Sequence, residues 1–159
     1  MSVKFIDAPE VEQIASRLIG QYHTHLDPAD IRFFFFAKYG KGGTLKPWVE
    51  CGRVLGYARK YTGEQKATLD APDFGIGILL NWWDGASAEQ KEAIVDHELM
   101  HCRYKDMDSD NLDVEEDDDT PPQPYIYQHE FQGFTDELKR HGAWNRTYEI
   151  VAEQLKMSI

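Results

Sequence analysis

Residues 74–103 read FGIGILLNWWDGASAEQKEAIVDHELMHCR, and this stretch predicts a strand, a turn and a helix in succession. The apolar run at 74–81 is typical of a strand buried in a sheet, and the next four residues are expected to form the turn. Ser87 and Gln90 have the spacing of a capping box, in which each side chain bonds the backbone N–H of the other residue. The helix should therefore begin at about 88, reach about 103 and pack against the sheet.

This predicted helix contains the sequence HELMH at 97–101. His97 and His101 lie four residues apart, so both imidazoles project from one helix face, one turn apart. Zinc binds neutral imidazole nitrogens, and catalytic zinc sites use three protein ligands and a water molecule. Glu98 follows the first histidine and can accept a proton from that water, whose pKa the metal lowers. The pattern predicts a Zn²⁺ site with His97 and His101 as ligands and Glu98 as general base.

HELMH supplies only two ligands, so the third must come from elsewhere in the chain. A second long helix is predicted from about Tyr127 to Gly142, whose glycine suits a C-terminal cap. His129 near its start is the favoured third ligand, with the adjacent Glu130 as the alternative. His141 is a further candidate, but it lies about 18 Å from His129 along a single helix. Both histidines therefore could not bind one ion on such a helix.

The remaining pattern predicts a single α+β domain, with a three- to four-stranded sheet and the HELMH helix packed against it. Four consecutive phenylalanines in IRFFFFAK indicate a strand buried on both faces. An acidic loop is expected at 106–124. The other expected elements are helices at 8–22 and 146–156 and strands at 31–38 and 52–61.

The charge of the chain is concentrated in one segment. Nine of its 28 acidic residues fall in DMDSDNLDVEEDDD at 106–119, and the formal net charge is −11. The sequence contains no basic cluster of the kind that a nucleic-acid-binding protein would show, so nucleic acid is not an expected partner. No apolar run approaches the roughly 18 residues of a membrane span, and no secretory signal is evident. Two cysteines without CxxC spacing fit a reduced protein of the cytoplasm.

Several motifs together resemble the putative phage metallopeptidase family. The resemblance covers about residues 31–144. It includes the strand FGIGILL followed by Trp82 and Trp83, and the lead from Glu89 to Val95. Its other parts are VDHELMHCR at 95–103, HEFQGFTDELKRHGAW at 129–144 and the close RHGAW at 140–144.

This resemblance implies a compact zincin-like domain with His97, His101 and His129 as zinc ligands and Glu98 as general base. It implies a peptidase without fixing a substrate. The chain departs from the family pattern at Glu130, where Asp is usual, and at 132–133, where Gln and Gly stand in place of acids.

The leading hypothesis is a zinc metallopeptidase that cleaves a peptide bond in an intracellular protein, in the host cytoplasm if a phage encodes the enzyme. The alternative is a phage-encoded binding module on the same scaffold, which sequesters a host protein and keeps zinc as a structural ion. A peptidase also needs a donor for the oxyanion. The candidates for that donor are Tyr104, Tyr127 and His141.

Two residues beside the ligands have simpler interpretations. Asp96 is expected either to orient a ligand imidazole or to lie on the surface. Cys102 should be a buried small residue, because it points about 100° away from His101 on a helix.

Overall fold

A four-stranded mixed sheet forms the centre of the computed structural model, which describes residues 2–105, 122–129, 134–142, 144–145 and 149. The spatial order is β1-β2-β4-β3, so β3 and β1 are the two edge strands. The central pair, β2 and β4, is parallel, and each edge strand pairs antiparallel with its neighbour. The strands are β1 (Ser2–Asp7), β2 (Ile31–Tyr39), β3 (Gly56–Lys60) and β4 (Phe74–Leu79).

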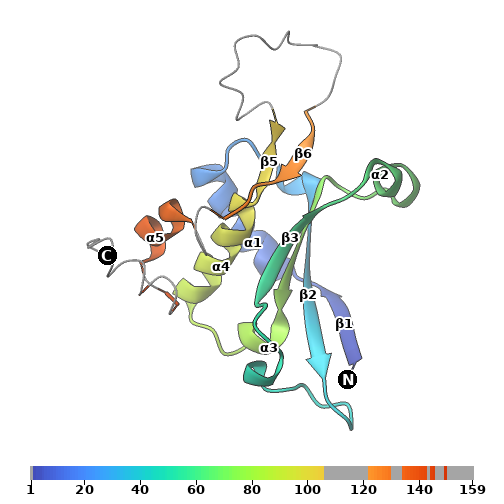
Figure 1. The fold of residues 1–159 in the computed structure, drawn as a ribbon, viewed down its shortest axis with the longest axis vertical. Coiled ribbons are helices and arrows are strands. Elements are labelled where there is room, and N and C mark those ends of the chain that lie inside the picture. Colours follow the sequence, from blue (N-terminus) through green and yellow to red (C-terminus); the bar gives the residue numbers. More distant parts are fainter. Residues whose placement is uncertain (1, 106–121, 130–133, 143, 146–148, 150–159) are drawn as a thin grey trace.

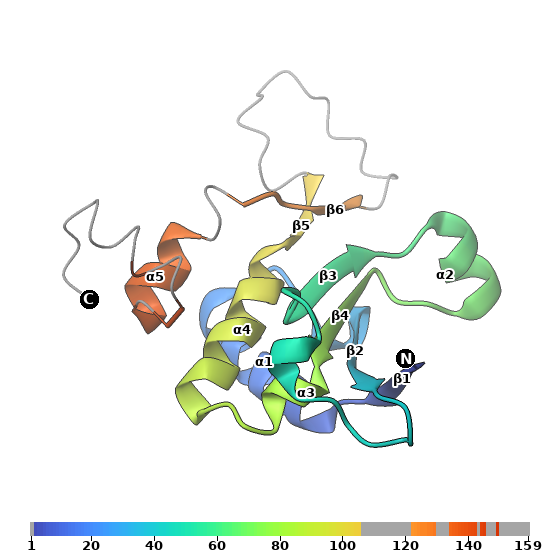
Figure 2. The same ribbon diagram turned by 60° about the horizontal axis from the view of Figure 1, so that its bottom comes forward.

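Two helices, α1 (Pro9–Tyr22) and α4 (Ala88–Met100), cover one face of this sheet (Figures 1 and 2). A second, two-stranded sheet of β5 (Cys102–Tyr104) and β6 (Pro124–Ile126) follows α4. In the described part of the chain, no helix combines the length and the apolar character that a membrane span requires. The shorter helices are α2 (Gly63–Leu69), α3 (Leu80–Trp83) and α5 (Thr135–His141), with 3₁₀ turns at Pro28–Asp30 and Trp48–Glu50.

The core lies between the helices and the inner face of the sheet. Every second residue of β4, from Phe74 through Ile76 to Ile78, is buried, as expected when strand side chains alternate between faces. Helix α1 contributes an apolar stripe that includes Val11 and Leu18, both fully buried. This packing fixes α4 against the sheet, and α4 contains HELMH.

The predicted α+β class, the three predicted strands and the helix at 8–22 are confirmed, but several boundaries differ. The strand β1 was not predicted, because all six of its residues are exposed and have no buried face. The prediction that β2 is buried on both faces is wrong at Arg32, which is exposed, and at Phe34, which is half-buried. The strand predicted at 52–61 begins only at Gly56, and Trp82 and Trp83 belong to α3 instead of the expected turn.

The second long helix, predicted from Tyr127 to Gly142, is wrong at its start, since residues 127–129 are not helical and the described helix α5 begins at Thr135. Directly after β6 pairs with β5, the N–H of Tyr127 donates to the carbonyl of His101, and this tertiary contact overrides the local helical pattern. Pairing of β5 likewise ends α4 at Met100, short of the predicted 103. Gly142 is the C-cap of α5 as predicted, with positive φ and its N–H bonded to the carbonyl of Leu138. The predicted helix at 146–156, except residue 149, and most of the acidic loop lie outside the described residues.

Loss of the Ser87 cap should destabilise the whole domain. Ser87 accepts the N–H of Gln90 and Gln90 bonds back to the N–H of Ser87, and this helix packs its buried residues on the core. We expect Ser87→Ala to lower the free energy of unfolding by about 1 kcal/mol and the melting temperature by about 2–4 °C, measured by calorimetry.

The matched control is Thr62→Ala, which removes the same capping box from α2. Because α2 has no buried residue, this change should leave the melting temperature nearly unchanged. Equal effects of the two variants would contradict the assignment of α4 as the helix on which the fold depends.

Candidate metal centre

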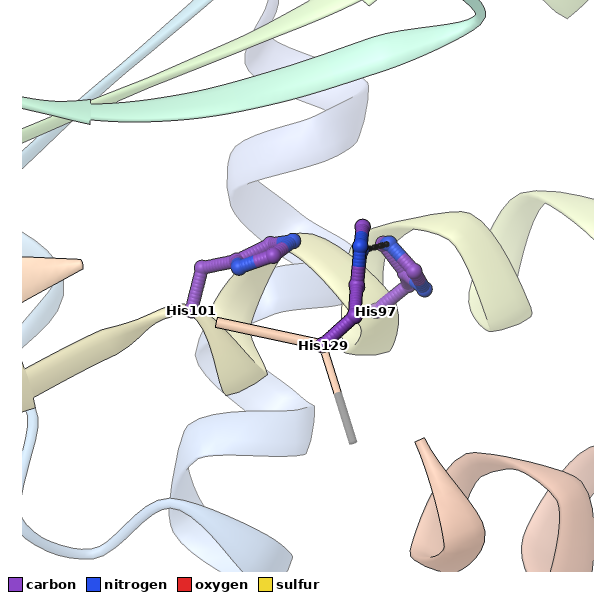
Figure 3. Close-up of side chains that lie close together, drawn as sticks. All are labelled: His97, His101 and His129. Atoms are coloured by element: carbon purple, nitrogen blue, oxygen red, sulfur yellow. Dashed lines mark hydrogen bonds between the residues drawn. The ribbon is translucent and has the colours of Figure 1, made fainter. Parts of the chain in front are cut away.

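The three histidines predicted as ligands converge in the structure (Figure 3). His97 and His101 project from the last turn of α4, with ring centroids 5.2 Å apart. One ring nitrogen from each of His97, His101 and His129 lies within 4.8 Å of the other two. This spacing is what three ligands of a single ion require, since Zn–N bonds are about 2.0–2.1 Å long.

His129 reaches the other two histidines through the small sheet, not through a helix. The pairing of Cys102 with Ile126 places β6 beside the end of α4, and the N–H of Tyr127 donates to the carbonyl of His101 at 2.8 Å. Two residues later, His129 Nε2 lies 3.0 Å from His97 Nε2. The predicted residue therefore occupies the predicted place on a different element. Glu130, the alternative ligand, lies outside the described residues.

Hydrogen bonds orient two of the imidazoles for metal binding. The Nδ1–H of His101 donates to the backbone carbonyl of Tyr127 at 2.6 Å, so a neutral His101 has its lone pair on Nε2. His97 uses Nδ1 in a bond of 2.8 Å with the carboxyl group of Glu137, which leaves its Nε2 directed toward His129. Metal-binding histidines typically make this second bond with a carbonyl or a carboxylate. The donor set thus fits a metal ion held by three Nε2 atoms.

The surroundings keep these imidazoles neutral. Burial lowers the pKa of His97 and of His101 to about 4. Phe134 packs against all three rings, with centroids 5.0 Å from His97, 5.0 Å from His101 and 5.2 Å from His129. At neutral pH a metal ion would therefore not have to displace protons from the half-buried His97 and His101.

Glu98 has a buried carboxyl group beneath strand β3. The residue is only 4% exposed, and its Oε2 has no hydrogen-bond partner among the described residues. A Cβ atom on Gly56 would lie 3.1 Å from Glu98 Oε1, so the strand passes directly against this side chain. Burial, reinforced by the negative charge of Glu137, raises the pKa of Glu98 to about 8. An unpaired buried carboxyl group is costly, and such groups occur mostly where chemistry or binding uses them.

Glu137 is a residue of the site that the sequence analysis missed. Its side chain on α5 is fully buried, and both carboxyl oxygens lie within 3.0 Å of His97 Nδ1. Burial, together with the charge of Asp96, raises the pKa of Glu137 to about 9. One sequence signal was available: Glu137 lies next to Leu138 and three residues after Phe134, on the apolar face of its helix.

Asp96 is a buried ion-pair centre, so the surface role considered for it is wrong. It has no exposed area, and it contacts His23 Nε2 at 2.5 Å, Arg140 Nη1 at 2.9 Å and His141 Nε2 at 2.8 Å. Neither His23 nor His141 belongs to the group of three histidines, so Asp96 orients none of the predicted ligands directly. These partners hold its pKa well below the usual range for an aspartate, against the opposing effect of burial.

The three predicted oxyanion donors lie in different places. His141 is bonded to Asp96 and does not belong to the group of three histidines. The hydroxyl of Tyr104 donates to Asp73 at 2.7 Å, and the ring of Tyr127 stacks on Phe134 at the wall of the site. An oxyanion role for any of the three stays a prediction. Cys102 is fully buried, as predicted, and follows the last ligand of α4.

Comparison with known proteins agrees with this geometry. A family model described as a putative phage metallopeptidase matches residues 3–152, almost the whole chain. No curated protein and no solved structure gives a significant match.

The bond from Glu137 to His97 should contribute to metal affinity. We expect Glu137→Gln to weaken Zn²⁺ binding about 10- to 100-fold, because the amide oxygen is a poorer acceptor for the N–H of a metal-bound imidazole. The measurement is competition for Zn²⁺ against a chromophoric chelator of known affinity.

The control is Asp136→Asn, which makes the same chemical change one residue earlier on an exposed side chain. This variant should bind Zn²⁺ like the unchanged protein. If Glu137→Gln also bound Zn²⁺ with unchanged affinity, the role given to Glu137 would be wrong.

Proposed function

The chain belongs to the family of putative phage metallopeptidases, and from this premise we propose that it is a zinc-dependent peptidase. The substrate would be a protein or peptide, and the place of action the cytoplasm of the host. The observation that carries the proposal is the convergence of one ring nitrogen from each of three histidines, two of which already use Nδ1 in a hydrogen bond.

The donor set favours zinc over the hard cations. Ca²⁺ and Mg²⁺ prefer oxygen ligands, whereas imidazole nitrogens suit Zn²⁺ and other late transition metals. Three protein ligands are also the number typical of a catalytic zinc site, since a structural site usually has four. A zinc ion held by these histidines would act as a Lewis acid, lowering the pKa of a water molecule toward 7 and polarising a carbonyl group.

Glu98 is suited to proton transfer in this site. Its carboxyl group is buried, its Oε2 has no hydrogen-bond partner within the described residues, and burial makes it more basic than an exposed glutamate. A carboxylate of this kind can take a proton from the attacking water and return it to the leaving amine. In the bound state, a nearby cation would bring its pKa down again, toward the ionised form that a base requires.

Strand β3 offers a place for an extended peptide. It is the last strand of its sheet, paired within the described residues only with β4. Its first residue, Gly56, has no side chain to separate the strand from Glu98. A peptide that pairs with the open edge of β3 would lie beside the carboxyl group that performs the proton transfer.

Removal of the third ligand tests the metal site. We expect His129→Ala to lose stoichiometric zinc, measured by native mass spectrometry, because two imidazoles bind zinc far more weakly than three. The comparison is His25→Ala, which removes a histidine that bonds the carbonyl of Cys102, lies outside the group of three and does not contact Asp96, and which should keep one zinc ion per chain. Full zinc retention in His129→Ala would overturn the assignment of that ligand.

Replacement of the proposed base separates chemistry from binding. Glu98→Gln should keep zinc and lose about 10²-fold or more of the cleavage rate on a peptide library, because the amide cannot accept the proton. Glu89→Gln changes an exposed residue in the first turn of the same helix and should cleave like the unchanged protein. If the biological effect of the protein survived Glu98→Gln, its function would be sequestration of a partner, not hydrolysis.

A further inference from the structure

The face of the central sheet that α1 and α4 leave uncovered has an unusual row of side chains. Strand register places Asp7, Phe34, Gly77 and Tyr57 side by side across all four strands. The neighbouring row contains Arg32, Gly75 and Arg59 on three strands. We name this surface the outer face, defined by the aromatic residues Phe5, Phe34, Tyr57 and Tyr61 and by the two arginines.

Two glycines of β4 make room for the aromatic rings. A Cβ atom on Gly77 would lie 2.8 Å from the Phe34 ring and 2.9 Å from the Tyr57 ring. A Cβ on Gly75 would lie 2.7 Å from the Tyr61 hydroxyl. The rings therefore lie down over the backbone of the central strand, where a larger residue would displace them. They leave an open groove of about 380 Å³ between the edge strands.

The aromatic surface of this groove remains accessible in part: Tyr61 is buried and Phe34 and Tyr57 are half-buried, but Phe5 is exposed. Phe5 is 67% exposed, although a phenylalanine normally favours burial. It contacts Phe34 edge to face, and Phe34 contacts Tyr57 in the same way, with centroids 5.9 and 5.8 Å apart. The groove thus presents a connected series of rings across the sheet, which is the arrangement on which flat π-systems stack.

The charge of the groove is positive. Arg59 and Arg32 are both exposed and both lie near Tyr61, with guanidinium carbons 4.6 and 5.8 Å from its ring centroid. Of the residues that line the groove, only Asp7 is acidic. A purely apolar partner would take both guanidinium groups out of water without supplying an anion, which is costly. The occupant must therefore supply anions as well as flat rings.

We propose that the outer face binds single-stranded nucleic acid. Each nucleotide supplies one base for the aromatic series and one phosphate for the arginines, and stacking does not depend on base identity. Four-stranded sheets with exposed aromatic residues bind unpaired bases in this way in other folds. The net charge of −11 opposes binding, but at 0.15 M salt charges more than about 8 Å from the groove are largely screened.

The surface lies opposite the metal centre, on the far side of the sheet from α4, and its binding does not depend on peptidase activity. The proposal differs from the expectation, drawn from the sequence, that nucleic acid is not a partner. The sequence shows no basic cluster because Arg32 and Arg59 are 27 residues apart and come together only through β4.

Fluorescence anisotropy of labelled dT12 and U12 oligonucleotides with the full chain tests the proposal. Both should bind, and a dT·dA duplex of the same length should bind at least 10-fold more weakly, because its bases are not available for stacking. Phe5→Ala should weaken binding about fivefold or more without changing its salt dependence. The double variant Arg32→Gln/Arg59→Gln should weaken binding and reduce the slope of log K against log salt by about 1.4.

The matched control is Arg17→Gln, which removes one positive charge from an exposed residue of α1 on the other side of the sheet. It should bind both oligonucleotides like the unchanged protein, and so should Glu98→Gln.

Three results would overturn the proposal: no anisotropy change for either oligonucleotide, an equal loss of binding in Arg17→Gln, or displacement of dT12 by polyglutamate as effectively as by unlabelled dT12. The last result would show that the groove binds anions without stacking bases, and an acidic peptide could then be its partner. A dimer in sedimentation velocity that Phe5→Ala abolishes would instead assign the face to a second copy of the chain.

Discussion

The buried carboxylate of Asp96 is the contact on which the geometry of the metal centre depends. A charge with no exposed area is tolerated only when it is paired and hydrogen-bonded, and the loss of one partner from such a site typically costs about 3–5 kcal/mol. Its partners come from two other parts of the chain: His23 at the end of α1, and Arg140 and His141 in α5. Asp96 therefore joins three helices at a point one residue before the first ligand.

The consequence for the site follows from the position of α5. Glu137 and Arg140 lie three residues apart and share one side of that helix. When Arg140 bonds Asp96, the carboxyl group of Glu137 meets Nδ1 of His97, one residue further along α4. Phe134, directly before α5, closes over the imidazoles from the same direction. The orientation of His97 and the position of Phe134 thus depend on the ion pairs of Asp96. The position of His129 depends separately on the pairing of β5 with β6.

The parts of the site that were predictable are those that local spacing determines. HELMH on a capped helix places His97 and His101 on one face whatever the rest of the chain does. His129 was predicted as a ligand on chemical grounds and lies close to the other two histidines, although it follows the strand β6 instead of opening a helix. Glu137 and Asp96 could not be assigned in the same way, because an acidic residue on a helix is ordinarily solvated and only tertiary packing buries these two. The edge strand β1 was missed for the opposite reason: it has no buried residue, so its sequence lacks the alternation that identifies a strand.

Strand β4 explains why the two faces of one sheet can serve different purposes. From Phe74 to Ile78 its sequence alternates between a large apolar residue and glycine, and these residues are buried by different parts of the molecule. Ile76 and Ile78 belong to the helical core, while Gly75 and Gly77 are covered by the rings of Tyr61, Phe34 and Tyr57. Glycine at 75 and 77 lets these aromatic residues lie close to the backbone, and isoleucine at 76 and 78 supports the layer that contains α4. A uniformly apolar β4 would have kept the core and displaced the aromatic groove, so the alternation itself indicates that the outer face is a built surface and not only the unused side of a scaffold.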